Sequence, residues 1–330
     1  CGARVMIRAA ICVLLLAAGS ASAQSVTGLY PEKILASDQP RFEERLGQIY
    51  RYGLWDFLDG PEKQALADAR LTFPLVGAND NPFDFYAGPE QDRPTIRLPV
   101  LSLKFIEDLC TAWAWRQVHG YSLEPFDEYV AMLKYRAPAD FAGGRYPDPL
   151  RALGVPAKIW EQEPAVDDLS LRLRNSAWAF ILAHEMGHLR YRHPGNAAVD
   201  PKTSQRQERE ADAFALDLMA RSEAIPMGAV LWFQATVGFF RNRADFATEA
   251  AYVDWQQRQA THPVNPERLQ SLALALDRAA GDSLNPGHAE VLRFIATRLA
   301  TIAETLAEPD MQRLIARQAV QGDPEDLKRR

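Results

Sequence analysis

The residues with the clearest chemical potential are His184, Glu185 and His188, which form the pattern His-Glu-Met-Gly-His. The pattern ends an apolar run, residues 177–183, that is typical of a buried helix. Residues four apart lie on the same face of a helix, so both imidazoles can reach one metal ion. Glu185 then points toward the remaining coordination position of the ion. This pattern indicates a Zn²⁺ site that activates water.

A catalytic zinc site needs a third protein ligand and a position for water. Glu208 follows His188 in a stretch with apolar residues at 211, 214, 215, 218 and 219, which predicts a second helix. Glu208 and Asp212 are four apart and share a face of that helix. We therefore expect Glu208 to be the third ligand and Asp212 to accept the free ring N–H of a ligand histidine. Glu210 is equally acidic, but it points to a different side of the helix.

Three blocks of the chain resemble gluzincin metallopeptidases, in particular the family of CAAX prenyl proteases, the bacterial membrane heat-shock protease and periplasmic assembly-quality-control proteases. The first block is residues 183–193, which carry the HExxH pattern and end in Arg-His. The second is residues 208–215. The third is residues 261–269, a His-Pro segment with an arginine six residues after the histidine. The chain shows no pair of long apolar segments, which argues against the integral-membrane branch of this family.

The resemblance implies specific roles for the residues in these blocks. Three of them would bind one Zn²⁺: His184, His188 and Glu208. Glu185 would be the catalytic base, and Asp212 would be the supporting carboxylate.

The oxyanion formed in peptide hydrolysis needs a hydrogen-bond donor besides zinc. His262, Arg268, Tyr252 and Tyr191 are candidates by residue type, and His262 and Arg268 also have the support of the resemblance. In some relatives the residue that matches His262 can approach zinc and keep the enzyme inactive. We therefore include His262 and Arg268 among the predicted catalytic residues. His193 is interpreted as a structural residue, either on the surface or at the end of the helix.

These patterns predict a zinc-dependent metalloendopeptidase that hydrolyses peptide bonds in protein or peptide substrates, with Glu185 activating a zinc-bound water. An alternative is a proteolytically silent zinc-binding chaperone or regulatory protein of the cell envelope, although such a protein has no need of Glu185. A third reading is a helical adaptor in which the HExxH pattern is accidental. That reading requires Glu208, Asp212 and the segment 262–268 to be further coincidences.

Residues 1–23 have the pattern of a cleavable secretory signal peptide. Arg4 and Arg8 supply the positive charge, residues 9–18 form the apolar stretch, and an Ala-Ser-Ala cleavage site ends at Ala23. The apolar stretch is shorter than the ~20 residues that a membrane span needs. An uncleaved anchor is the alternative. We expect a periplasmic or secreted protein.

Composition excludes some classes of protein. The net charge of −6 argues against nucleic acid as a partner. With 47% hydrophobic residues, the chain can build a sizeable core. Of the 3 cysteines, cleavage would leave Cys110 alone, which excludes an internal disulfide framework. The apolar helical pattern around Cys110 favours a buried residue over a nucleophile.

Helical patterns dominate after residue 100, so we predict a mainly α fold (α+β, zincin-like) with at most a small sheet or edge strand. The best strand candidate is Thr95–Val100, which Pro99 would confine to an edge or a strand end. A strand beside the metal could pair with an extended substrate, although a plain connecting segment is the favoured alternative. Residues 228–240 could make a peripheral membrane contact, but a core helix is favoured.

The predicted organisation has four parts: a signal peptide (1–23), an N-terminal region (24–160), a metallopeptidase core with C-terminal helices (161–321) and a flexible tail (322–330). The N-terminal region begins with a helical pattern at 40–59, followed by a turn-rich stretch at 73–94. Further helices are expected near residues 100–118, 124–136, 168–192, 203–223, 226–241, 246–260, 264–280, 287–307 and 309–320.

Overall fold

The computed structural model describes residue 26 and residues 28–330, apart from residues 80, 195–198 and 259–263. The predicted signal peptide and His262 therefore lie outside the described residues. The described part consists of helices and one small sheet, which confirms the prediction of a mainly α fold.

Within the described ranges, no helix is both long enough and apolar enough to cross a membrane.

The elements follow the predicted order closely after residue 100. The α-helices are α1 (Glu32–Gln48), α2 (Gly60–Leu66), α3 (Val100–Val118), α4 (Glu124–Tyr135), α5 (Pro149–Ala152), α6 (Ile159–Gln162), α7 (Pro164–Arg190), α8 (Pro201–Arg221), α9 (Met227–Phe239), α10 (Glu249–Arg258), α11 (Pro266–Asp282), α12 (Pro286–Ala307) and α13 (Pro309–Gln321). The strands are β1 (Arg70–Thr72), β2 (Tyr86–Glu90) and β3 (Arg93–Arg97). The first helix begins earlier than the predicted residue 40 and continues into a π-helical turn, Ile49–Leu54.

The sheet has the order β1-β3-β2, with β1 parallel and β2 antiparallel to β3. The predicted strand Thr95–Val100 overlaps β3, but β3 is the central strand and α3 already begins at Val100. The strand β2 forms an edge of the sheet. It comes from the stretch predicted as turns, because Gly88 and Pro89 are uncommon in strands and conceal the pattern.

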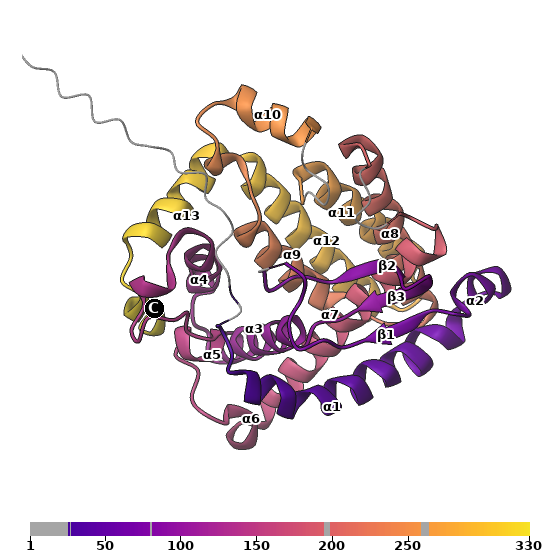
Figure 1. Cartoon of the computed structure of the whole chain (residues 1–330), viewed down its shortest axis with the longest axis horizontal. Helices are drawn as coiled ribbons and strands as arrows, with labels where there is room; N and C mark the ends of the chain where they lie inside the picture. Colours follow the sequence, from indigo (N-terminus) through magenta and orange to yellow (C-terminus); the bar gives the residue numbers. More distant parts are fainter. Residues whose placement is uncertain (1–25, 27, 80, 195–198, 259–263) are drawn as a thin grey trace, which may run out of the picture.

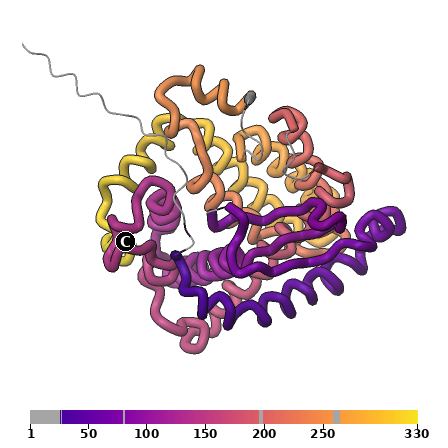
Figure 2. Tube along the Cα trace, in the orientation of Figure 1, coloured from indigo at the N-terminus to yellow at the C-terminus, as the bar shows by residue number. Residues whose placement is uncertain are grey.

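Helix α7 is the central element of the molecule. The sheet lies over it, and α3, α8 and α9 pack around it (Figure 1). The tube in Figure 2 shows β2 on the side of α8 and α9, and β1 on the side of α1. The 27 residues of α7 give it a length of about 40 Å. Residues 177–189 are buried except Ala179, as the apolar run predicts.

Helices α7 and α8 approach closely at Gly187, the glycine between the two histidines. A Cβ atom built on Gly187 would lie 2.9 Å from the Cα atom of Ala211 and 3.2 Å from its carbonyl oxygen. Such contacts are too short for any side chain, so only glycine allows this approach. The close packing brings the helix of the two histidines against the helix that carries Glu208.

Helix α1 is tied to both α3 and α7. Phe42 on α1 is fully buried against the ring of Trp178 on α7, with centroids 5.5 Å apart and planes at 80°. Arg41 donates to both oxygens of Glu107 on α3, each at 2.7 Å, and Arg174 on α7 binds the same carboxylate at 2.5 Å. Burial raises the pKa of Glu107, but the two guanidinium groups outweigh burial and lower it.

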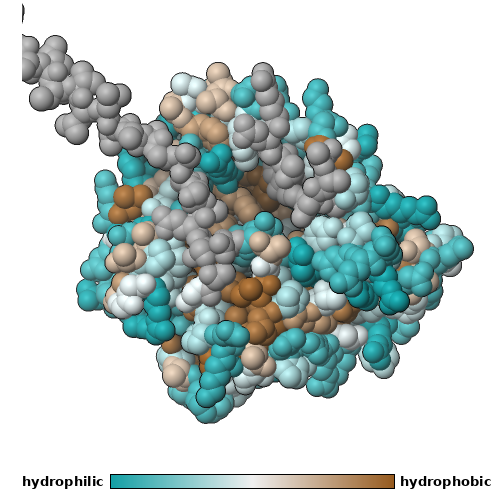
Figure 3. Space-filling view, viewed as in Figure 1, coloured by the Kyte–Doolittle hydropathy of each residue, from teal (hydrophilic) through white to brown (hydrophobic). Residues whose placement is uncertain are grey.

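Helix α9 contains most of the stretch that the sequence leaves open as a membrane contact. It packs against α4, α7 and α12, and Leu231 and Phe233 are buried. The face in Figure 3 is mostly hydrophilic, with small apolar patches. The stretch therefore occupies the core position that the sequence favours.

The C-terminal segment, predicted as a flexible tail at 322–330, contains a short helical turn. Residues Pro324–Lys328 form a 3₁₀ turn, and Leu327 is 1% exposed. Its carbonyl oxygen accepts a hydrogen bond from Arg116 Nη1 at 3.5 Å. The buried leucine anchors an otherwise polar segment, a contact that depends on tertiary packing.

Candidate metal centre

Three side chains from α7 and α8 place their potential ligand atoms around one point. His184, His188 and Glu208 are 4%, 8% and 3% exposed. The Nε2 atoms of the two histidines are 3.1 Å apart, and each lies 3.5 Å from an oxygen of Glu208. Two nitrogen ligands of a tetrahedral Zn²⁺ are about 3.4 Å apart. The donor types and their spacing therefore fit a zinc-sized ion, and this group could hold a metal.

His184 is supported by a buried acid on α8. Oδ1 of Asp212 lies 2.9 Å from Nδ1 of His184, the ring nitrogen that would face away from the metal. Asp212 also raises the pKa of His184, as a hydrogen-bonding carboxylate at this distance does. Asp212 is 2% exposed and follows Glu208 by one helical turn. One helix thus supplies both a ligand and the support of another ligand.

Arg268 on α11 holds the two acids of α8 together. Its Nη1 lies 2.9 Å from an oxygen of Glu208, and its Nε and Nη2 donate to the two oxygens of Asp212 at 2.6 and 2.8 Å. Burial raises the pKa of Asp212, but Arg268 outweighs burial and lowers it below its usual value. Arg268 thus binds one candidate ligand and the acid that supports another, and its charge also interacts with that of Glu185.

The electrostatics of the cluster favour a positive charge at the ligand positions. Burial lowers the pKa of His184, but Asp212 and Glu208 outweigh burial and raise it to about 10. In the metal-free protein, His184 therefore carries a proton at neutral pH. A metal ion must displace this proton, because only the unprotonated ring nitrogen is a ligand.

His188 has a different support, which the sequence analysis did not identify. The chain turns back after α7, and the Nδ1 atoms of His193 and His188 are 2.9 Å apart. Nε2 of His193 lies 3.1 Å from Oε2 of Glu210. If His188 held a metal through Nε2, its Nδ1–H would donate to His193, whose Nε2–H would donate to Glu210. His193 is 7% exposed, so its interpretation as a surface residue is wrong.

The edge strand β2 lies within electrostatic reach of Glu185. Burial and the charge of Glu90 raise the pKa of Tyr86 on β2, Arg97 opposes this rise, and Glu185 adds to it. The guanidinium group of Arg97 lies over the ring of Tyr86, 4.8 Å from its centroid. Glu185 is 7% exposed, on the turn of α7 between the two histidines. The candidate base and the sheet edge therefore belong to one region of the molecule.

The remaining candidates for an oxyanion donor are Tyr191, Tyr252 and His262. Tyr191 is 47% exposed at the end of α7, and Tyr252 lies on α10, half-buried. His262 lies outside the described residues. The ring of Trp232 on α9 packs beside His184, with centroids 6.3 Å apart, and its position could be found only from tertiary packing.

The fold and the cluster define a helical protein that could hold one metal ion between two packed helices. The family model of peptidase U49 matches residues 160–285, which include α7 to α11 and all three candidate ligands. No curated protein and no solved structure matched the chain. The match and the cluster together support a peptidase.

Proposed function

We propose that the protein is a zinc-dependent endopeptidase of the gluzincin type, with His184, His188 and Glu208 as zinc ligands. The observation that supports this most is the spacing of the three ligand atoms, within a segment that matches a peptidase family. Zn²⁺ in this position would lower the pKa of a bound water toward neutrality and polarise a substrate carbonyl.

Glu185 is the proposed general base. It accepts a proton from the attacking water and passes that proton to the leaving amine nitrogen. Asp212 and Arg268 hold His184 and Glu208 in place from behind. The charge of Arg268 lowers the pKa of buried Asp212, and the same guanidinium group lies 2.9 Å from an oxygen of Glu208.

The strand β2 is the proposed docking element for an extended stretch of substrate. In the described ranges, β2 pairs with β3 on one side and has no strand on the other. An unpaired strand edge offers backbone donors and acceptors to a peptide. The packing of α7, which carries Glu185, against β2 supports a substrate path along this edge.

The test is zinc content by elemental analysis and casein cleavage, for the wild type and two variants. We expect Glu185→Gln to retain zinc and lose cleavage, and His188→Ala to lose zinc. Exposed residues provide the controls Glu304→Gln and His119→Ala, which should keep both properties. Zinc without cleavage in the wild type would favour the silent chaperone or regulator. A wild type without zinc affinity would reject the proposal.

We also propose that the protein is exported, because residues 1–23 have the pattern of a secretory signal. Cell fractionation and N-terminal sequencing test this proposal. The expected mature N-terminus is Gln24. A protein that stays in the cytoplasm with residues 1–23 intact would contradict it.

A further inference from the structure

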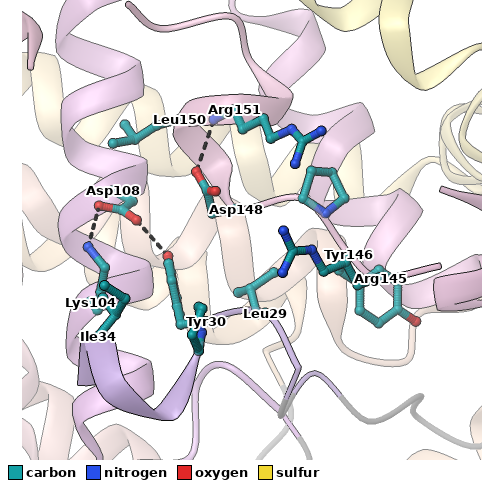
Figure 4. Close-up of a pocket in the computed structure, with 12 residues that line it drawn as sticks. Leu29, Tyr30, Ile34, Lys104, Asp108, Arg145, Tyr146, Asp148, Leu150 and Arg151 are labelled. Atoms are coloured by element: carbon teal, nitrogen blue, oxygen red, sulfur yellow. Dashed lines mark hydrogen bonds and ion pairs between the residues drawn. The ribbon is translucent and has the colours of Figure 1, made fainter. Parts of the chain in front are cut away.

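A cavity lies between the start of α1, helix α3 and the segment that enters α5 (Figure 4). It shares no residue with the candidate metal centre. Its volume is about 330 Å³, at the lower end of the ~300–1,000 Å³ of small-molecule pockets. Its walls come from residues 29–34, 104–108 and 145–151, which are far apart in the sequence. The fold therefore assembles this cavity from three separate segments.

One wall of the cavity carries buried Asp108, and both of its carboxylate oxygens accept hydrogen bonds. The hydroxyl of Tyr30 donates to Oδ2 of Asp108 at 2.7 Å, and Nζ of Lys104 donates to Oδ1 at 3.3 Å. Burial raises the pKa of Asp108 to about 7, although Lys104 and Tyr30 oppose this rise. Lys104 is already paired with Asp108 and, at 3.7 Å, with Asp38, so the groups still available to a ligand are those of the rim.

The rim carries two arginines, Arg145 and Arg151, whose side chains are exposed. Among the residues with described positions, neither guanidinium group has a hydrogen-bond or ion-pair partner. Asp148, which lies between them in the sequence, accepts a hydrogen bond from the backbone N–H of Arg151 at 3.0 Å. Figure 4 shows both guanidinium groups on the same side of the pocket. The carboxylate of Asp148 also lines the pocket and offsets one of the two arginines, so the rim keeps one net positive charge and favours an anion.

The remaining lining is largely apolar. Leu29, Ile34 and Leu150 line the cavity together with Tyr146, which is 2% exposed. Apolar walls with a few placed charges are typical of sites for small organic ligands. An inorganic anion would use the arginines and leave these walls in contact with water. A ligand with both an anionic and an apolar part uses the whole cavity.

We propose that this pocket binds a carboxylate attached to a small apolar group. Arg145 and Arg151 bind the carboxylate, because planar guanidinium groups match its two oxygens. The apolar part lies along Leu29, Ile34 and Leu150. Such a group is supplied by a free short-chain acid or by the C-terminus of a peptide with an apolar last residue. This proposal does not depend on the peptidase activity.

The experiment is titration calorimetry on the whole protein with hexanoate and acetate. We expect hexanoate to bind at least tenfold more tightly than acetate. The double variant Arg145→Ala/Arg151→Ala should bind hexanoate at least tenfold more weakly. The matched control is Arg293→Ala/Arg317→Ala, which removes the same charge from exposed positions and should bind as the wild type does. Circular dichroism checks the fold of each variant.

Two further probes distinguish the sources of the carboxylate. Binding of acetyl-Ala-Leu but not of its C-terminal amide identifies a peptide C-terminus, and binding of hexanoate alone identifies a free acid. Either result supports the proposed pocket only when the double variant Arg145→Ala/Arg151→Ala binds the same ligand more weakly. Binding that persists in the double variant comes from elsewhere, such as the metal centre, and overturns the proposal. Absence of binding, or equal affinity for acetate and hexanoate, also overturns it.

Discussion

The two candidate histidine ligands differ in what holds them. His184 contacts Asp212, which binds Arg268 of α11 through two hydrogen bonds. Asp212 and Arg268 are both at most 4% exposed. His188 rests on the imidazole of His193, which leads to Glu210, a residue with 43% side-chain exposure. The first support is a buried ion cluster shared by three helices, whereas the second is a local turn that ends at the surface. We therefore expect the first to govern stability and the second mainly metal affinity.

The largest effect should come from Arg268→Leu. The change leaves Asp212 and Glu208 buried without their cation, which should lower the free energy of unfolding by about 3–5 kcal/mol. Urea unfolding of the chelator-treated protein measures this loss. The control is Arg278→Leu, an exposed residue of the same helix. A loss no larger than that of the control would show that the ion cluster does not stabilise the fold.

A pH effect should follow from His184. Its pKa in the folded, metal-free protein is raised to about 10, above the ~6.5 of an unfolded chain. The stabilisation is therefore fully present below pH ~6.5 and is lost as pH rises through about 10, with a slope of at most ~1.4 kcal/mol per pH unit. Urea midpoints of the chelator-treated protein between pH 6 and 10 test this. In the variant His184→Asn, the free energy of unfolding should not change with pH in this way. An equal pH dependence in that variant would show that other groups cause it.

Loss of the second support should weaken metal binding. We expect His193→Ala to lower zinc affinity about 10–100-fold, because His188 loses the acceptor that orients its ring. Competition with a chromophoric chelator measures the affinity, and His119→Ala is the control. Added imidazole should restore part of the affinity by filling the vacated space. Unchanged affinity in His193→Ala would show that the His193 contact does not orient the ligand.

The smallest effect should come from Glu210→Gln. The side chain is 43% exposed, and exposed charge pairs contribute ~0.2–1 kcal/mol, which is less than about fivefold in affinity. The same chelator competition measures it. If Glu210→Gln lowered zinc affinity as much as His193→Ala does, His193 and Glu210 would act as one unit. Buried His193 and exposed Glu210 would then not differ in their effect on zinc affinity.

The extent to which the sequence predicts the site depends on whether a contact lies within one helix. The pairs His184/His188 and Glu208/Asp212 each lie on one helix, so their common faces follow from helical spacing. Arg268 reaches Asp212 only because α11 packs near α8. Spacing along the chain contains no information on that packing.

The turn after α7 and the sheet were harder to predict, because they depend on backbone conformation and on strand pairing. His193 reaches His188 through a turn in which Arg192 has a φ of 56°, a conformation that residue type did not indicate. The short strand β2, with Gly88 and Pro89, is stabilised by its pairing with β3 and not by strand propensity. The mainly α class, by contrast, follows from apolar periodicity over long segments.

The contacts of α1 have a consequence for proteolytic processing. Phe42 covers Trp178 on the central helix, and Arg41 supplies one of the two cations on buried Glu107. A cut that released α1 would expose an indole of the core and remove charge compensation from that carboxylate. Helix α1 is therefore part of the packed core, and we expect its release to destabilise the protein.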